Sequence, residues 1–191
     1  MNLNYLNELN FMKCGNIGVL TVYLEGDKEM VIREMLLSDI ESVRDIAAHT
    51  WRDTYSTFIP EEIQDRVLNE AYSAVAMDNR FKSSLLLVSE KDEEIMGYAF
   101  FSGELSGKDI FLESLYVHPN HQGKGIGKQL LLTGLTKFKE PTSLSLTVYK
   151  GNPNISFYKR EGFKVVTENM GDFFGHPVVF TLMKKNLKWT G

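Results

Sequence analysis

The spacing of hydrophobic residues changes its period along the chain, and each period predicts a different kind of element. Residues 31–36 alternate between apolar and polar types like a strand. Residues 38–41, Ser-Asp-Ile-Glu, match a capping box that favours the start of a helix. Apolar positions then recur at helical spacing from Ile40 to Thr50. The pattern predicts a strand followed at once by a helix.

A second helical region is predicted over residues 60–81. It starts at Pro60, a residue that helices tolerate in their first turn. Two glutamates follow, and carboxylates favour the positive end of the helix dipole. We expect a break in this region near Asn69.

From residue 84 onward the period shortens to two, which indicates strands. Residues 84–90 and 95–103 flank a turn-like Lys-Asp-Glu-Glu and are typical of a hairpin, and residues 110–118 predict a third strand. The elements expected after these are a helix at 130–138, a strand at 144–149, a helix at 154–162 and strands near 165–170 and 178–184.

This order of elements predicts the fold class. It reads β-α-α-β-β-β-α-β-α-β-β, which indicates a mixed α+β domain with a twisted, mostly antiparallel sheet of about seven strands. Four helices would flank the sheet on both faces, since crossovers through helices are needed to bring strands parallel. We expect this domain to span residues 30–191.

Residues 1–29 do not fit the pattern of the domain. They are rich in Asn and Leu and contain one weak strand candidate at residues 17–24. One hypothesis is that translation begins at Met30, because residues 24–27 are compatible with a purine-rich ribosome-binding sequence in the gene. The rival hypothesis is a genuine extension that adds an edge strand or a dimer contact, so a homodimer is also considered.

Composition and charge narrow the class of protein. The 191 residues carry a net charge of −4, which gives no basic field for nucleic acid or an anionic membrane. The single cysteine, Cys14, excludes an internal disulfide framework, and four dispersed histidines predict no metal site. No apolar run reaches the ~20 residues that span a bilayer, and the N-terminus lacks a positively charged signal region. A soluble cytoplasmic protein is expected.

Three glycines stand where the strand at 110–118 gives way to a helix. Gly123, Gly125 and Gly127 occupy alternate positions at the helix start. The first N–H groups of a helix have no internal partner, and glycine lets a ligand approach the main chain closely. With Lys124 and Lys128 nearby, this segment predicts a phosphate cradle. Its spacing fits neither a P-loop nor a dinucleotide fingerprint.

The same segment carries a resemblance to a known family. Val117-His118-Pro119 followed by Gln122-Gly123-Lys124-Gly125-Ile126-Gly127 resembles the acyl-CoA signature of the GNAT N-acetyltransferase superfamily. Residues 157–163, Phe-Tyr-Lys-Arg-Glu-Gly-Phe, resemble the second motif of this superfamily. The order of elements is also similar, over residues 30 to about 185. Among subgroups, the sequence is most similar to bacterial small-amine acetyltransferases, including the polyamine type.

The resemblance implies a cofactor and the residues that bind it. Acetyl-CoA would be the co-substrate, and no metal would be needed. Main-chain N–H groups would hold the diphosphate, and the strand before them would offer backbone groups to the pantetheine arm, with the N–H of Val117 polarising the thioester carbonyl. The residues implied are Leu115, Tyr116, Val117, Gln122, Gly123, Lys124, Gly125, Ile126, Gly127, Lys128, Asn152 and Asn154. Relatives usually carry Asn where Gly151 stands here, so Asn152 is displaced by one residue.

Two residues are candidates for proton transfer. In similar enzymes the tyrosine of the Phe-Tyr pair, here Tyr158, directs its hydroxyl at the sulfur of coenzyme A. Glu113 lies two and four residues before Leu115 and Val117, on the same face of a regular strand. We expect Glu113 to accept the amine proton, directly or through a chain of waters.

The acceptor pocket in this superfamily is lined by the first two helices and the loop between them. Trp51 and Tyr55 suit that place because aromatic walls hold amines by cation–π contact. The expected function is acetyl transfer to a primary amine of a small molecule, a polyamine or amino-compound, by direct attack in a ternary complex. The alternatives are a peptide or ribosomal N-terminus as acceptor, and a non-catalytic coenzyme A-binding module.

Overall fold

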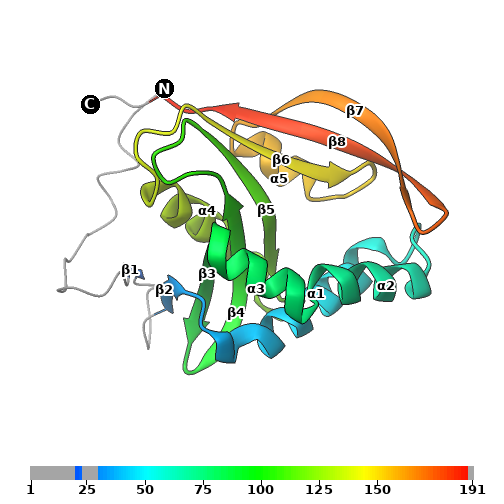
Figure 1. The fold of residues 1–191 in the computed structure, drawn as a ribbon, viewed down its shortest axis with the longest axis horizontal. Coiled ribbons are helices and arrows are strands. Elements are labelled where there is room, and N and C mark those ends of the chain that lie inside the picture. The colour runs from blue at the N-terminus through cyan, green and yellow to red at the C-terminus, as the bar shows by residue number, and fades with distance from the viewer. Residues whose placement is uncertain (1–19, 23–29, 189–191) are drawn as a thin grey trace.

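The computed structural model describes residues 20–22 and 30–188 of the chain, and these residues form one mixed sheet with helices on both faces (Figure 1). The eight strands lie in the order β1-β2-β3-β4-β5-β6-β8-β7. Among the described strands, only β5 and β6 pair in parallel, and all other neighbours are antiparallel. The mixed, mostly antiparallel sheet expected from the sequence is therefore confirmed.

The strands form two groups that meet at the β5–β6 pair. The first group consists of β1 (Leu20–Val22), β2 (Met30–Glu34), β3 (Ser84–Lys91), β4 (Glu94–Ser102) and β5 (Asp109–Val117). The second consists of β6 (Ser143–Tyr149), β7 (Lys164–Phe173) and β8 (His176–Asn186). The pairing of β5 with β6 begins at Asp109 and Ser143 and ends at Leu112 and Leu146. Beyond that point the two strands diverge (Figure 1).

Helices cover the two faces of the sheet and create two cores. On one face, α1 (Ile40–Tyr55) and α3 (Ala74–Ser83) pack against Leu86, Val88, Tyr98 and Phe100, and α2 (Glu61–Ala71) adds partly buried residues. On the other face, α4 (Ile126–Thr136) and α5 (Ile155–Arg160) pack against Leu87, Ala99 and Phe101. Neighbouring residues of β3 and β4 thus alternate between the two cores, as the pleat of a strand requires.

The second helical region consists of two helices, α2 and α3, rather than one helix with a break near Asn69. The interruption falls at residues 72–73, between the end of α2 and the start of α3. Ser73 caps α3, because its hydroxyl accepts a 3.2 Å hydrogen bond from the N–H of Ala76. The cap therefore moves the break toward the C-terminus by a few residues.

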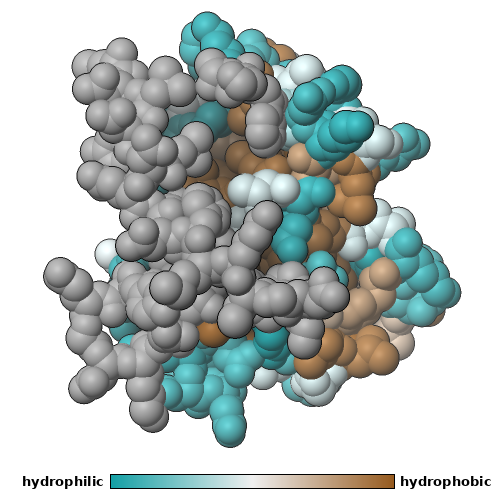
Figure 2. Space-filling view, turned by 90° about the vertical axis from the view of Figure 1, so that its left-hand side faces the viewer, coloured by the Kyte–Doolittle hydropathy of each residue, from teal (hydrophilic) through white to brown (hydrophobic). Residues whose placement is uncertain are grey.

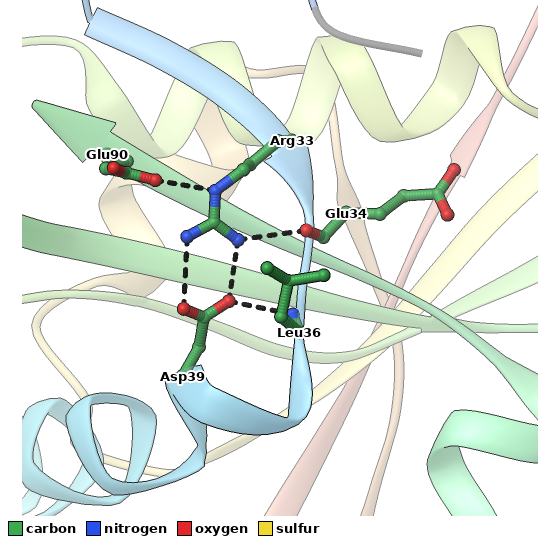
Figure 3. Close-up of polar contacts among 5 residues, drawn as sticks. All are labelled: Arg33, Glu34, Leu36, Asp39 and Glu90. Atoms are coloured by element: carbon green, nitrogen blue, oxygen red, sulfur yellow. Dashed lines mark hydrogen bonds and ion pairs between the residues drawn. The ribbon is translucent and has the colours of Figure 1, made fainter. Parts of the chain in front are cut away.

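The start of α1 also differs from the expected capping box. A short 3-10 helix at Leu37–Asp39 precedes α1, and the N-cap residue Asp39 makes no side-chain hydrogen bond to the helix. Its carboxylate instead accepts a 2.7 Å hydrogen bond from the N–H of Leu36 and binds both terminal nitrogens of Arg33, at 2.6 and 3.0 Å (Figure 3). Arg33 also donates to Glu90 at 2.5 Å. This cluster ties β2, β3 and the entry to α1 together.

Strand β1 lies within the weak strand candidate at residues 17–24. It pairs antiparallel with β2 at the outer edge of the sheet, with Thr21 opposite Val31. The rest of residues 1–29, with Cys14, lies outside the described residues. No helix in the described ranges is long and apolar enough to cross a membrane. On the face in Figure 2, hydrophobic side chains reach the surface in patches separated by hydrophilic ones.

Candidate active site

A cavity of about 360 Å³ opens where β5 and β6 diverge. Strand β5, the start of α4, the end of β6, α5 and the last turns of α1 all contribute to its lining. The site residues expected from the sequence line this cavity, with the exceptions of Trp51 and Lys124. The fold thus brings together segments that are separated by about half of the chain.

The backbone at the end of β5 is turned toward the cavity. The N–H of His118 donates to the carbonyl of Met96 at 2.9 Å, so Val117 and Gly97 form a non-hydrogen-bonded pair between β5 and β4. The N–H and C=O of Val117 therefore point away from β4, to the side that β6 has left. Leu115, two residues earlier in the same register, has the same orientation. Both residues line the cavity.

Two side chains fix the end of this strand. The carbonyl of Val117 accepts a 3.1 Å hydrogen bond from the Gln122 amide and a 3.5 Å hydrogen bond from the Thr50 hydroxyl. Thr50 is buried on α1, so helix and strand hold each other at this point. The sequence predicted a role for Gln122 through its main-chain N–H alone, and it did not assign Thr50 to the site. These contacts occupy the carbonyl of Val117 and leave its N–H directed at the cavity.

The glycines at the start of α4 differ in what they contribute. Gly123 and Gly125 have φ of +78° and +79°, a left-handed conformation that favours glycine, and an added Cβ would stand in open space. Gly127 has no such angle, and its Cβ would make ordinary contacts with Val117 and Phe157 at 3.7 and 3.9 Å. Two of the three glycines are thus required by the backbone of the turn.

The N-terminus of α4 presents donors to the cavity. Gly125 is the N-cap and has no side chain, so no side-chain oxygen caps the helix. The first helical hydrogen bond runs from the N–H of Gln129 to the carbonyl of Gly125 at 3.1 Å. The N–H groups of Ile126 and Gly127 come before this first hydrogen bond, so they have no partner within the helix. Both residues line the cavity. This end of the cavity suits an anion.

The cations near this cradle are only partly those expected. Lys128 lines the cavity and lies 3.9 Å from a carboxylate oxygen of Glu161. The ammonium of Lys124 is turned back instead, and donates to the carbonyl of Asn120 at 3.3 Å. Arg160 lines the cavity from the end of α5 and was missed by the sequence analysis. Its place directly after the Phe-Tyr-Lys run is the signal that could have found it.

Tyr158 is almost completely buried on α5 and lines the cavity. Burial raises the pKa of its hydroxyl above the ordinary value of 10, so the group is protonated at neutral pH. Within the described residues, no hydrogen-bond partner of this hydroxyl is found. Phe157 and Phe163 hold the ring by edge contacts, with centroids at 5.2 and 5.7 Å. The side chain is thus a fixed hydroxyl donor at the cavity wall.

Glu113 does not share a face with Leu115 and Val117 as a regular strand would require. The pairing of β4 with β5 shifts there: Phe100 lies opposite Ser114 and Phe101 opposite Leu112, which leaves Glu113 as the extra residue of a β-bulge. The bulge breaks the alternation on which the expectation was based.

The bulge brings the Glu113 carboxylate to α3. It accepts a 3.0 Å hydrogen bond from Arg80 and a 3.1 Å hydrogen bond from Ser84, and it also lines the cavity. Arg80 lies over the rings of Tyr72 and Phe100, at 5.8 and 5.7 Å from their centroids. Glu113 is therefore a charge-paired carboxylate at the edge of the cavity.

Asn152 forms a buried link between the two halves of the site. Its amide donates to the hydroxyl of Tyr55 at 2.7 Å, and its carbonyl oxygen accepts from the N–H of Asn154 at 2.8 Å. Tyr55 closes the cavity from the last turn of α1, while Asn154 is the N-cap residue of α5. The displaced asparagine still reaches the cavity and also orders the start of α5.

Trp51 lies behind the cavity wall rather than in it. The side chain is 3% exposed, and its indole N–H donates to the hydroxyl of Tyr116 at 3.1 Å. It packs edge-on against Tyr55 and Tyr149, with centroids at 4.9 and 5.6 Å. Trp51 therefore supports the aromatic wall from the core, and Tyr55 and Tyr149 face the cavity. The helical spacing of Trp51 and Tyr55 did not show that one lies behind the cavity wall and the other in it.

Comparison with known proteins identifies the family. The acetyltransferase (GNAT) family model matches residues 40–163, which include the diverging strands, the glycine turn and α5. The chain belongs to the GNAT acetyltransferase family. It is therefore an enzyme of the acyltransferase class, and the family expected from the two motifs is confirmed.

Individual relatives of this GNAT chain act on different acceptors. Spermidine N(1)-acetyltransferase of Thermoplasma acidophilum is 29% identical over 151 residues, 74% of this chain and 92% of that protein. Peptidyl-lysine N-acetyltransferase YjaB of Salmonella typhimurium is 32% identical over 91 residues, 47% of this chain and 56% of that protein. The crystal structure of PaiA N-acetyltransferase from Thermoplasma acidophilum with coenzyme A has a TM-score of 0.70 and 26% identity, covering 83% of this chain and 99% of that chain.

Proposed function

We propose that this GNAT enzyme transfers the acetyl group of acetyl-CoA to a primary amine of a small molecule, by direct attack in a ternary complex. The observation that carries the proposal is the divergence of β5 from β6 directly at the uncapped N-terminus of α4. One cavity then offers anion-binding N–H groups at one end and strand N–H groups beside them. A ligand with a diphosphate followed by an extended amide chain would use both sets: the diphosphate would bind the first group of N–H donors, and the amide chain would pair with the second.

Coenzyme A would bind along this line of backbone groups. Its diphosphate would accept hydrogen bonds from main-chain N–H groups between Gln122 and Lys128, with Arg160 contributing charge. The pantetheine arm would pair with the outward-facing backbone of Leu115, as a strand replacing β6. The coenzyme A complex of the PaiA relative supports this assignment.

The thioester would be activated at the end of β5. The N–H of Val117 would donate to the thioester carbonyl, whose oxygen becomes negatively charged when the amine attacks. Such a preorganised donor is worth about 2.7–4 kcal/mol of transition-state stabilisation. Gln122 and Thr50 would hold this N–H in place through the Val117 carbonyl.

Tyr158 would serve the departing thiolate. A thiol has a pKa of about 8.5 and a tyrosine about 10, and burial raises the pKa of Tyr158 further. Complete proton transfer to sulfur is therefore uphill. We assign Tyr158 a hydrogen bond to the sulfur, which stabilises the thiolate until a proton arrives.

Glu113 would remove the charge of the acceptor. The amine is protonated at pH 7 and must lose a proton before it attacks the carbonyl carbon. Arg80 donates to one carboxylate oxygen of Glu113 and Ser84 donates to the other. A carboxylate that is held in this way at the cavity lining suits the orientation of a proton-accepting water.

The acceptor would lie between Tyr55, Tyr149 and the last turns of α1. Both rings line the cavity and would hold a cationic amine by cation–π contact, and the lining residue Thr54 has a hydroxyl. The spermidine acetyltransferase relative supports a polyamine or related small amine. The peptidyl-lysine acetyltransferase relative supports a protein amine as the second candidate, although it aligns over less than half of this chain.

A thiol-release assay tests the proposed function. The full chain is mixed with acetyl-CoA and a panel of polyamines, amino acids, amino sugars and lysine peptides, and free coenzyme A is followed with a thiol reagent. Release that depends on a small amine supports the proposal, and release only with peptides selects the protein acceptor. No release with any amine, while coenzyme A raises the melting temperature, would make the chain a binding module.

A further inference from the structure

Two histidines that are far apart in the sequence lie together outside the cavity. His49 is on the exposed side of α1, and His118 directly follows β5. Their ring centroids are 5.0 Å apart, and the rings are tilted by 51° rather than stacked. Asp45 lies one helical turn before His49, and one ligand atom from each of the three residues falls within 4.8 Å of the other two. The sequence indicated dispersed histidines, but the fold gathers these two.

The spacing fits one shared metal ion. Two imidazoles on a tetrahedral zinc ion, with Zn–N bonds of about 2.0–2.1 Å, place their ring centroids about 5 Å apart. Ligand atoms on such an ion are about 3.3 Å from each other. The ligand atoms of the three residues lie within 4.8 Å of one another, and the side chains of Asp45 and His49 are more than half exposed, so small rotations bring the ligand atoms to this spacing.

The hydrogen bond of His49 leaves Nε2 of the ring available to bind a metal ion. Nδ1 of His49 lies 2.9 Å from the carbonyl of Asp45, and a carbonyl oxygen only accepts, so Nδ1 carries the proton. The lone pair of a neutral ring is then on Nε2. A ligating histidine ordinarily donates its other N–H in this way.

His118 has the opposite arrangement in the free protein. Its Nδ1 accepts a hydrogen bond of 3.3 Å from the N–H of Asn120. Binding through Nε2 moves the ring proton to Nδ1 and gives up this long bond, which is a small cost. The two rings therefore converge from two elements with one ring already in the ligating tautomer.

We infer that Asp45, His49 and His118 form a zinc-binding site, with the fourth position taken by water. Two imidazoles and a carboxylate are ligands that zinc prefers, whereas magnesium and calcium prefer oxygen ligands alone. None of the three residues lines the cavity. The site lies one residue along from the contact of Thr50 with Val117, so a bound ion cross-links α1 to the end of β5.

Titration calorimetry of the full chain without a histidine tag tests this inference. With zinc chloride we expect one ion per chain and a raised melting temperature, and no heat with magnesium chloride. His49→Ala and Asp45→Asn should each weaken zinc binding by about tenfold or more. Both replaced side chains are exposed on α1, so circular dichroism should show an unchanged fold.

Two control variants separate this site from other zinc ligands. His176→Ala removes a histidine of β8 that contacts the carbonyl of Phe58 at 3.0 Å, and should leave zinc binding unchanged. Cys14→Ser removes the thiol and should also leave it unchanged. Absence of zinc binding in the parent chain overturns the inference. So does full binding in the His49→Ala/His118→Ala double variant, or loss of binding in Cys14→Ser alone.

Discussion

The side-chain amide of Asn152 donates a 2.7 Å hydrogen bond to the hydroxyl of Tyr55, across 97 positions of sequence. Both side chains are buried, and together they join α1 to the loop that leads into α5. The end of α1 at the cavity and the loop that leads into α5, the helix of Tyr158, are therefore joined by one hydrogen bond.

Breaking this hydrogen bond should lower the free energy of unfolding, and a double-mutant cycle should show that Asn152 and Tyr55 interact. Asn152→Ala leaves the Tyr55 hydroxyl buried without its donor, and we expect a loss of about 1–3 kcal/mol in the free energy of unfolding. Tyr55→Phe removes the other partner. In urea denaturation the double variant should lose less than the sum of the two single variants. Strictly additive losses would mean that the two groups do not interact.

Tyr158→Phe should lower kcat by about tenfold or more while the affinity for coenzyme A stays nearly unchanged. The reason is that in the proposed mechanism the hydroxyl acts on the thiolate, which appears only during the reaction. Because burial raises the pKa of Tyr158, the wild-type rate should not fall with its ionisation between pH 7 and about pH 10. A steady-state pH profile measures this. An unchanged kcat in the variant removes Tyr158 from the mechanism.

Gly125→Ala should weaken coenzyme A binding and destabilise the fold, because alanine is strained at φ of +79° and the turn that presents the N–H groups of α4 would have to shift. A loss of about 1 kcal/mol or more in the free energy of unfolding is expected. Gly127→Ala is the matched control, since its Cβ meets only ordinary contacts. Calorimetry with coenzyme A compares the two. Equal affinities in both variants would contradict the role given to the turn.

Glu113→Gln should reduce kcat/KM for the amine by about tenfold, within the range by which positioned acid–base groups act. Arg80 then keeps a hydrogen-bond acceptor but loses its charged partner. Glu168→Gln, which removes an exposed partner of Lys150, serves as the control and should leave the rate unchanged. An identical rate in the two variants would show that the charge of Glu113 is not used.

The Arg33–Asp39 pair should make stability depend on pH below about pH 4. Burial raises the pKa of Asp39, but hydrogen bonds from Arg33 and the N–H of Leu36, with the charge of Arg33, lower it more, so the net pKa falls below the ordinary 3.8. The carboxyl group of Asp39 therefore binds a proton less tightly in the folded state than in the unfolded state. The pair stabilises the fold above the unfolded pKa, and this stabilisation is lost as pH falls through the folded pKa.

Asp39→Asn isolates that contribution. The variant should be less stable at pH 7 and should lose less stability than the wild type on acidification to pH 3. Glu41→Gln, which removes an exposed partner of Arg44, should change stability by less than about 1 kcal/mol. Thermal unfolding at both pH values compares the three proteins. A wild type and Asp39→Asn that lose stability in parallel would contradict the assignment.

The sequence predicted the order of elements because most elements carry their own hydrophobic period. It also located the glycine turn and Tyr158, whose motifs are local. It misplaced Glu113 because a bulge depends on the partner strand, which the alternation of one strand does not reveal. It treated Trp51 and Tyr55 as equal because helical spacing gives a common face but not the depth at which each side chain ends.

Contacts between distant segments were beyond the sequence for the same reason. Arg80 reaches Glu113 only after α3 packs on the sheet, and His118 meets His49 only when β5 ends against α1. The residues of each pair are far apart in the sequence, so no local spacing predicts their contact.

Calorimetric titration of the wild-type chain with coenzyme A and, separately, with ADP is the most direct test of the proposed site. Backbone N–H groups of the α4 turn and of β5 act together in this account, so coenzyme A should bind one equivalent per chain and ADP much more weakly. Heat with ADP and none with coenzyme A would contradict the assignment of the diverging strands to the pantetheine arm.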